Sequence, residues 1–293
     1  AIGIDGEEKD QVTRGVKPEI TLREGLLFST AEAYYRSRKL GAELLDISEE
    51  NSSMGRIVTG RVIREGKILL AGPSSTQSLK RWMQDIGRYG VDLKIVDGAL
   101  NRLSLASPAV SQAMILSTGA AYSAELNTLV NKTKYVVELI SSAMTDKRIV
   151  EGFEGLDNGI WGRSDEGEVV NITRKSSLIL KEINEDFLKK CKIIYVAGAL
   201  TDTFLSILNN SPLLRGTTLV VDDFTKVFVS ERSMRLFKRR GGVLEVMRKS
   251  KLIAVCVNPT APNGYVLDSD LLCGKLEEVI GLPVYDIVKN NYL

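Results

Sequence analysis

The amino-acid sequence predicts an α/β protein with two domains, each built on a parallel β-sheet. Two short apolar runs, at residues 94–97 and 114–121, stop at Asp-Gly and Thr-Gly steps, which is typical of neighbouring buried strands. In the second half, strand-like runs alternate with amphipathic segments, as they do in βαβ units. With 293 residues, of which 44% are hydrophobic, the chain is long and apolar enough to bury a substantial core.

The first domain is predicted to span residues 1–148. Residues 55–72 hold two β-rich runs around a glycine-containing turn at 64–66, which indicates an antiparallel hairpin inserted in this domain. Further helices are expected at 76–89 and 124–140. The first of these two helices is supported by apolar residues that recur at helical spacing, so that they form one buried face. These residues are Leu79, Trp82, Met83 and Ile86.

A glycine-rich stretch separates the two predicted domains. Residues 149–168 contain many glycines and charges without apolar periodicity, so we expect a linker or surface loop there. The second domain is then residues 169–293. Its expected strands are 169–172, 193–197, 218–221 and 252–257, and its expected helices are 181–190, 202–209, 231–239 and 270–280.

Composition excludes several classes of function. The formal charge is only +2, with 39 Lys and Arg against 37 Asp and Glu, so a dedicated nucleic-acid binder is not expected. Polar residues interrupt the longest uncharged stretch, so no membrane partner is expected. The three cysteines lack metal-knuckle or redox spacing, which favours a cytoplasmic location. The chain has no histidine, which removes Ser-His-Asp and Cys-His catalysis.

Asp97 is the first candidate for a functional carboxylate. It is predicted to end a strand of a parallel sheet, where this architecture often places a Mg²⁺ ion bridged to phosphates. Asn101 and Arg102 follow closely and could reach the same crevice. The alternative is that Asp97-Gly98 is only a tight turn, since both residue types favour turns.

Other strand-to-helix junctions are weaker candidates. Ser74 and Ser75 stand at a helix start, where backbone amides could bind an anion, although such residues most often only cap the helix. The same two interpretations apply to Thr118-Gly119. Asp222-Asp223 ends another strand and is expected either to face a ligand or to form a turn. The phosphate-loop pattern G-x-x-x-x-G-K-[ST] does not occur in this sequence.

Several sequence segments together suggest a family. The stretches A-I-G-I-D-G-E-E-K-D-Q-V-T, A-G-P-S-S, I-V-D-G-A-L-N-R-L-S-L-A-S-P and A-M-I-L-S-T-G-A resemble the B-type subunits of the lysine 5,6-aminomutase reactivase family, encoded beside adenosylcobalamin-dependent lysine and ornithine aminomutases. More distantly, the first domain is similar to P-loop proteins of the dethiobiotin-synthetase group. That similarity implies a P-loop-NTPase-like first domain, in which Asp97 is a Mg²⁺ ligand and Asp10 a second one. The missing phosphate loop departs from that group.

The resemblance implies a nucleotide-linked accessory factor that reactivates a cobalamin-dependent amino-acid aminomutase. The expected cofactors are Mg²⁺ and ATP, and the expected partner is the aminomutase or the ATPase subunit of its reactivase. Two alternatives stay open: an ATP-dependent ligase that activates a carboxylate, and a scaffold without catalytic activity. The sequence also leaves open whether the chain forms a homo-oligomer.

Overall fold

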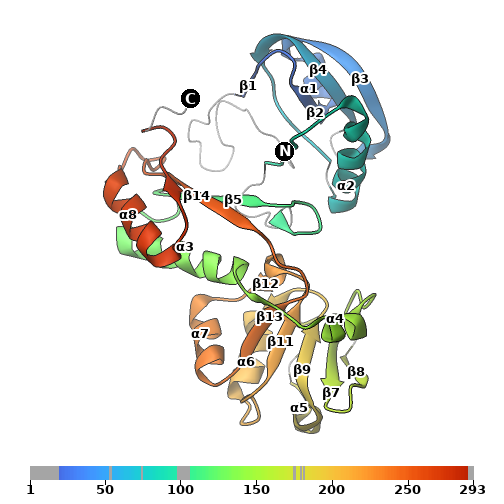
Figure 1. The fold of residues 1–293 in the computed structure, drawn as a ribbon, viewed down its shortest axis with the longest axis vertical. Coiled ribbons are helices and arrows are strands. Elements are labelled where there is room, and N and C mark those ends of the chain that lie inside the picture. Colours follow the sequence, from blue (N-terminus) through green and yellow to red (C-terminus); the bar gives the residue numbers. More distant parts are fainter. Residues whose placement is uncertain are drawn as a thin grey trace. The chain divides into compact units, whose positions relative to one another are not determined.

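The computed structural model describes residues 20–52, 55–73, 75–97, 106–173, 176–178, 180 and 182–289. The chain divides into two compact units: unit 1 contains Ala1–Leu105 and Ala261–Tyr265, and unit 2 contains Ala106–Thr260 and Val266–Leu293. The chain combines helices with sheets, some of them parallel, so the predicted α/β character is confirmed (Figure 1). Within the described ranges, no helix is both long and apolar enough to cross a bilayer.

Unit 1 is built around the long strand β4 (Gly55–Lys67). It pairs antiparallel with β1 (Thr21–Leu22), β2 (Leu27–Ala31) and β3 (Lys39–Ser52). All three pairings are antiparallel, so the parallel sheet expected here is not found among the described residues of this unit. The predicted hairpin turn at 64–66 is also wrong, because these residues continue β4 and Arg64 is in register with Gly41 of β3.

Two helices accompany the sheet of unit 1. They are α1 (Glu32–Arg36) and α2 (Thr76–Asp85), which continues into the 3-10 turn η1 (Ile86–Tyr89), so the helix predicted over 76–89 is confirmed. Leu79 and Ile86 are buried, as the apolar spacing predicts. Trp82 donates a hydrogen bond from Nε1 to Oγ1 of Thr59 at 3.0 Å, which ties α2 to β4. Trp82 is therefore part of the packing between helix and sheet.

Unit 2 contains a six-stranded sheet with the order β6-β13-β11-β9-β7-β8. Its first four strands are parallel to one another, β7 is antiparallel to β9, and β8 is antiparallel to β7. The strands are β6 (Ala143–Met144), β7 (Ile160–Ser164), β8 (Val169–Thr173), β9 (Cys191–Val196), β11 (Thr218–Val221) and β13 (Val243–Val246).

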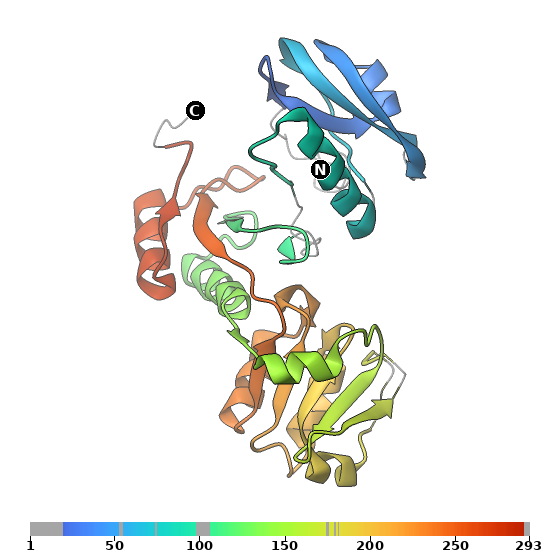
Figure 2. The same cartoon turned by 45° about the vertical axis from the view of Figure 1, so that its right-hand side comes forward.

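Helices cover both faces of this sheet (Figure 2). α4 (Lys147–Phe153) packs on one face, where the ring of Phe153 stacks on Tyr195 of β9 with centroids 5.0 Å apart. α6 (Asp202–Asn210) and α7 (Glu231–Arg239) cover the other face. The remaining elements are α5 (Glu185–Lys190), the 3-10 turn η3 (Phe224–Lys226) and a short parallel pair of β10 (Leu200–Thr201) with β12 (Val227–Phe228).

A second, three-stranded parallel sheet completes unit 2. Its order is β15 (Val284–Tyr285), β14 (Leu252–Asn258), β5 (Met114–Gly119). α3 (Leu126–Ile140) and α8 (Ser269–Ile280) lie side by side along this sheet (Figure 1). The strands predicted at 114–121 and 252–257 and the helices predicted at 124–140 and 270–280 are thus confirmed.

The division into units differs from the domain boundaries expected at 148 and 168. The sequence predicts β5 in the first domain and β14 in the second, yet the two strands pair directly in unit 2. The glycine-rich residues 149–168 contain the end of α4 and all of β7, which is inside the six-stranded sheet. Three of their glycines, Gly155, Gly159 and Gly167, have positive φ and lie between the regular elements, while Gly152 belongs to α4 and Gly162 to β7.

The contact between β5 and β14 gives a stability prediction. A Cβ atom at Gly119 would lie 2.1 Å from the carbonyl oxygen of Asn258. Gly119→Ala must push the two strands apart, and we expect it to lower the free energy of unfolding by about 1–3 kcal/mol. Gly274→Ala in α8 is the control: nothing lies within 4 Å of its Cβ, and we expect a gain of up to about 1 kcal/mol. Urea denaturation of both variants measures the difference, and equal stabilities would contradict the prediction.

Candidate functional site at the carboxyl ends of the parallel strands

Five of the residues expected in a site lie outside the described part of the chain. These residues are Asp10, Ser74, Gly98, Asn101 and Arg102. Their expected roles in binding Mg²⁺ or nucleotide stay predictions.

Asp97 lies in unit 1 on a segment that forms no strand. Residues 91–97 follow η1 without regular secondary structure, so the strand predicted at 94–97 is wrong. The physical reason is that the apolar run does not enter a core: Leu93 and Ile95 are 75% and 83% exposed. Asp97 is exposed as well. Its assignment as a catalytic and Mg²⁺-binding carboxylate stays a prediction. The strand end on which that assignment is based is not present at Asp97.

The remaining expected residues are divided between the two units. Ser75, in unit 1, caps α2 by accepting a hydrogen bond from the backbone N of Ser78 at 3.0 Å. In unit 2, Oγ1 of Thr118 lies 2.8 Å from Oγ1 of Thr133, which links β5 to α3. Gly119 is buried where β5 approaches β14. Each of these residues has a structural role, which neither requires nor excludes a ligand.

A different group of polar residues gathers where the parallel strands of the six-stranded sheet end. β11 ends at Val221 and is followed by Asp222 and Asp223, while Arg248 follows the neighbouring strand β13. β11 lies between β13 and β9, so these residues stand at the middle of the parallel set. Ligands of open α/β sheets bind at this edge, outside the carboxyl ends of the strands.

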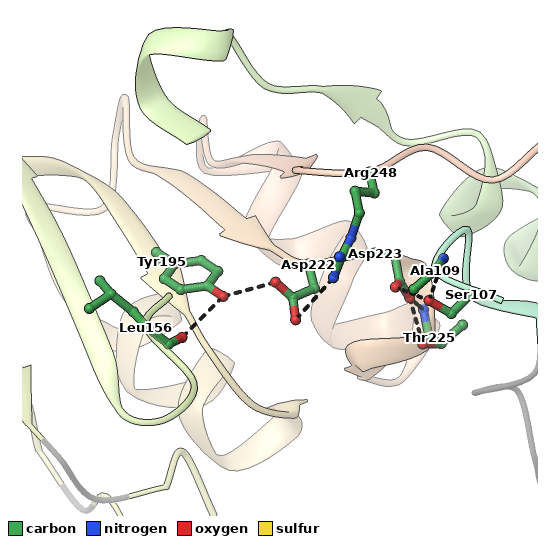
Figure 3. Close-up of polar contacts among 8 residues, drawn as sticks. All are labelled: Ser107, Ala109, Leu156, Tyr195, Asp222, Asp223, Thr225 and Arg248. Carbon is green, nitrogen blue, oxygen red and sulfur yellow. Dashed lines mark hydrogen bonds and ion pairs between the residues drawn. The ribbon is translucent and has the colours of Figure 1, made fainter. Parts of the chain in front are cut away.

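Asp223 has a structural role. The residue is only 1% exposed, and its carboxylate accepts hydrogen bonds from Oγ of Ser107 at 2.6 Å and from both N and Oγ1 of Thr225, at 2.9 and 2.5 Å (Figure 3). These donors satisfy a carboxylate that would otherwise be costly to bury. They also fix the segment at Ser107 to the edge of the sheet. Of the two interpretations of Asp222-Asp223, turn formation is confirmed for Asp223.

Asp222 is placed differently. Its Oδ1 accepts a hydrogen bond from the hydroxyl of Tyr195 at 2.9 Å, and its Oδ2 lies 3.6 Å from Nη2 of Arg248 (Figure 3). The side chain of Asp222 is 23% exposed and that of Arg248 is 52% exposed. The backbone N of Arg248 also donates to the carbonyl O of Asp222 at 2.9 Å. Oδ1 of Asp222 is thus fixed by the buried Tyr195, and Oδ2 faces the guanidinium of Arg248 at a distance longer than a hydrogen bond.

Tyr195 orients this carboxylate from inside the core. The residue is 3% exposed, and burial, the negative charge of Asp222 and the hydrogen bond to Asp222 raise the pKa of its phenol. Tyr195 therefore stays a neutral donor throughout the physiological range. Such a support holds a carboxylate in one orientation, as outer hydrogen bonds do for residues that bind metals.

The arrangement could bind a cation and an anion side by side. Asp222 presents a partly exposed oxygen, and Arg248 presents a guanidinium suited to phosphate or carboxylate. Among the described residues, no group of three acidic or cysteine side chains could enclose a metal ion. A Mg²⁺ ion here would keep most of its waters, as is usual when the ion arrives with phosphates. Sequence reasoning identified Asp222, but nothing in the sequence connects it with Tyr195 and Arg248.

Comparisons with known proteins add no identification: no family model matches the chain, and no curated protein or solved structure shows significant similarity to it.

The buried phenol of Tyr195 gives a prediction about pH. Because its pKa is higher in the folded state, its stabilising effect is complete below the unfolded pKa near 10 and is lost as pH rises further. Tyr195→Phe removes the donor to Asp222 and should cost about 0.5–1.5 kcal/mol at neutral pH. The variant should then lose less stability than the parent protein as pH rises to about 11.

Urea denaturation at several pH values measures both effects. Tyr265→Phe is the control, because it removes a hydroxyl from a ring that is 48% exposed. This control should match the parent protein at every pH. The prediction fails if Tyr195→Phe and Tyr265→Phe give the same dependence on pH.

Proposed function

We propose that the protein is a nucleotide-linked accessory factor that reactivates a cobalamin-dependent amino-acid aminomutase. The family proposal comes from the sequence resemblance. The structural support for nucleotide binding comes from one observation: Asp222, held by Tyr195, lies beside Arg248 at the carboxyl edge of the parallel strands. We place the binding of Mg²⁺·ATP at this edge of unit 2.

The residues at this edge suit such a ligand. The 3.6 Å ion pair between Asp222 and Arg248 is longer than a hydrogen bond and partly exposed, so an incoming ligand can replace it at low cost. Asp222 would then contact the hydrated Mg²⁺ ion, and Arg248 would contact a phosphate. Thr145, which directly follows β6 at the same edge, is 3% exposed, and its Oγ1 has no hydrogen-bond partner among the described residues. Bound Mg²⁺ would neutralise the phosphate charges and fix their orientation.

Removing either charge should weaken the binding of nucleotide. We expect Asp222→Asn and Arg248→Ala each to raise the Kd for Mg²⁺·ATP by at least about tenfold, because each removes a contact between opposite charges. Chelation of Mg²⁺ by EDTA should weaken binding to the parent protein and have less effect on Asp222→Asn. Calorimetric titration measures these affinities.

Two control variants remove the same charges elsewhere in unit 2. They are Asp165→Asn, directly after β7, and Arg239→Ala, at the end of α7 that leads into the start of β13. Both positions belong to the opposite edge of the sheet, and both variants should bind Mg²⁺·ATP like the parent protein. Unchanged affinity in Asp222→Asn would overturn the placement at this edge. If the parent protein shows neither binding nor a thermal shift with Mg²⁺·ATP, the scaffold alternative replaces this proposal.

Asp97 provides a separate test of the site expected from sequence. If that carboxylate binds the Mg²⁺ ion, Asp97→Ala should raise the Kd for Mg²⁺·ATP by at least about tenfold and leave the protein folded, since the side chain is exposed. Calorimetry and thermal denaturation of the same sample measure both quantities. Unchanged affinity removes Asp97 from the nucleotide site.

The proposed biological role is tested with the partner enzyme. An aminomutase inactivated during turnover is incubated with the protein, Mg²⁺·ATP and fresh adenosylcobalamin. Recovery of activity that requires both the protein and the nucleotide supports the role, and Asp222→Asn should reduce this recovery. Recovery that is the same without the protein contradicts it.

A further inference from the structure

A groove of about 460 Å³ lies in unit 2, and its lining includes neither Asp222 nor Arg248, although Lys249 directly follows Arg248 in the chain. Three segments line it: the end of α3, the chain that leads into β14, and the end of α8. Small-molecule sites commonly have volumes of about 300–1,000 Å³, so the groove can hold a ligand of several non-hydrogen atoms.

The lining of this groove combines apolar walls with positive charge. Four apolar side chains form the walls: Ile140, Leu252, Ile280 and Leu282. Lys249 and Lys251 stand on either side of the buried Ser250, whose Oγ donates to the carbonyl O of Ala106 at 3.2 Å. This bond fixes the segment that carries the two lysines.

The charge of the groove is unbalanced. None of the residues that line it is acidic, and neither lysine has an ion-pair partner within the described ranges. The carboxyl ends of α3 and α8 each carry a partial negative charge from the helix dipole. These partial charges are smaller than the full positive charges of the two lysines and offset them only in part. The lysines' full positive charge therefore favours a ligand that carries a full negative charge.

We propose that this groove binds a small organic carboxylate with an aliphatic body. The apolar walls take the aliphatic part, and Lys249 and Lys251 take the carboxylate. Inorganic phosphate fits less well, because it has no apolar part to replace the water that covers the walls. This groove shares no lining residue with the proposed nucleotide site, and its test does not depend on nucleotide binding.

Hexanoate is the probe, and ¹⁵N-labelled protein reports where it binds by nuclear magnetic resonance. We expect saturable shifts at the groove residues with a Kd of about 1 mM, as suits a ligand with few atoms. Hexan-1-ol, which has the same chain without the charge, and inorganic phosphate should each bind at least about tenfold more weakly.

Two matched double variants test the role of the lysines. Lys249→Ala/Lys251→Ala should weaken the binding of hexanoate by about tenfold. Lys190→Ala/Lys238→Ala removes the same charge from exposed positions on α5 and α7, and it should bind like the parent protein. Ser141→Trp, which fills the groove from the end of α3, should also reduce binding.

Three results would overturn the proposal. The first is the absence of saturable shifts with hexanoate, and the second is equal binding of hexanoate and hexan-1-ol. The third is equal weakening by the two double variants, which would show a general effect of net charge.

Discussion

The pairing of β5 with β14 is the constraint on which the architecture of unit 2 depends. Ser117 and Cys256 are in register, although residues 120–251 lie between the two strands. All of the six-stranded sheet is contained in that interval, so both of its chain ends must return to the three-stranded sheet. The pairing of β6 with β13 meets this requirement, because it places the first and last strands of the interval side by side. The entropy of closing so long a loop is offset by the folded sheet within it.

The two adjacent aspartates after β11 have different roles: Asp223 stabilises the loop, and Asp222 is available to a ligand. Successive side chains of an extended backbone point in opposite directions. Asp223 therefore points into the protein and uses its oxygens on Ser107 and Thr225, while Asp222 reaches the partly exposed edge beside Arg248. The buried partners of Asp223 stabilise the loop, and that stability keeps Asp222 in place for a ligand.

Local elements follow from the sequence, and their assembly does not. The helix at 76–89 is set by the spacing of Leu79, Trp82 and Ile86, and the strands β9 and β11 by apolar runs. Periodicity says nothing about partners, so it could not show that β5 pairs with β14. Apolar residues also do not guarantee a strand: the run at 94–97 contains an exposed Ile95. In the site, the sequence marks Asp222, but the convergence of Tyr195 and Arg248 on it depends on three separate strands.

The order of the strands along the chain affects synthesis on the ribosome. β5 and α3 are made before their partners β14 and α8. Until these partners have been made, the three-stranded sheet is incomplete and the apolar face of α3, including Leu129 and Val137, is uncovered. The six-stranded sheet has all its strands by residue 246 and can fold first. During this delay the nascent chain exposes an amphipathic helix and an unpaired strand, which is the kind of surface that chaperones bind. The smaller sheet therefore closes after all strands of the six-stranded sheet have been made.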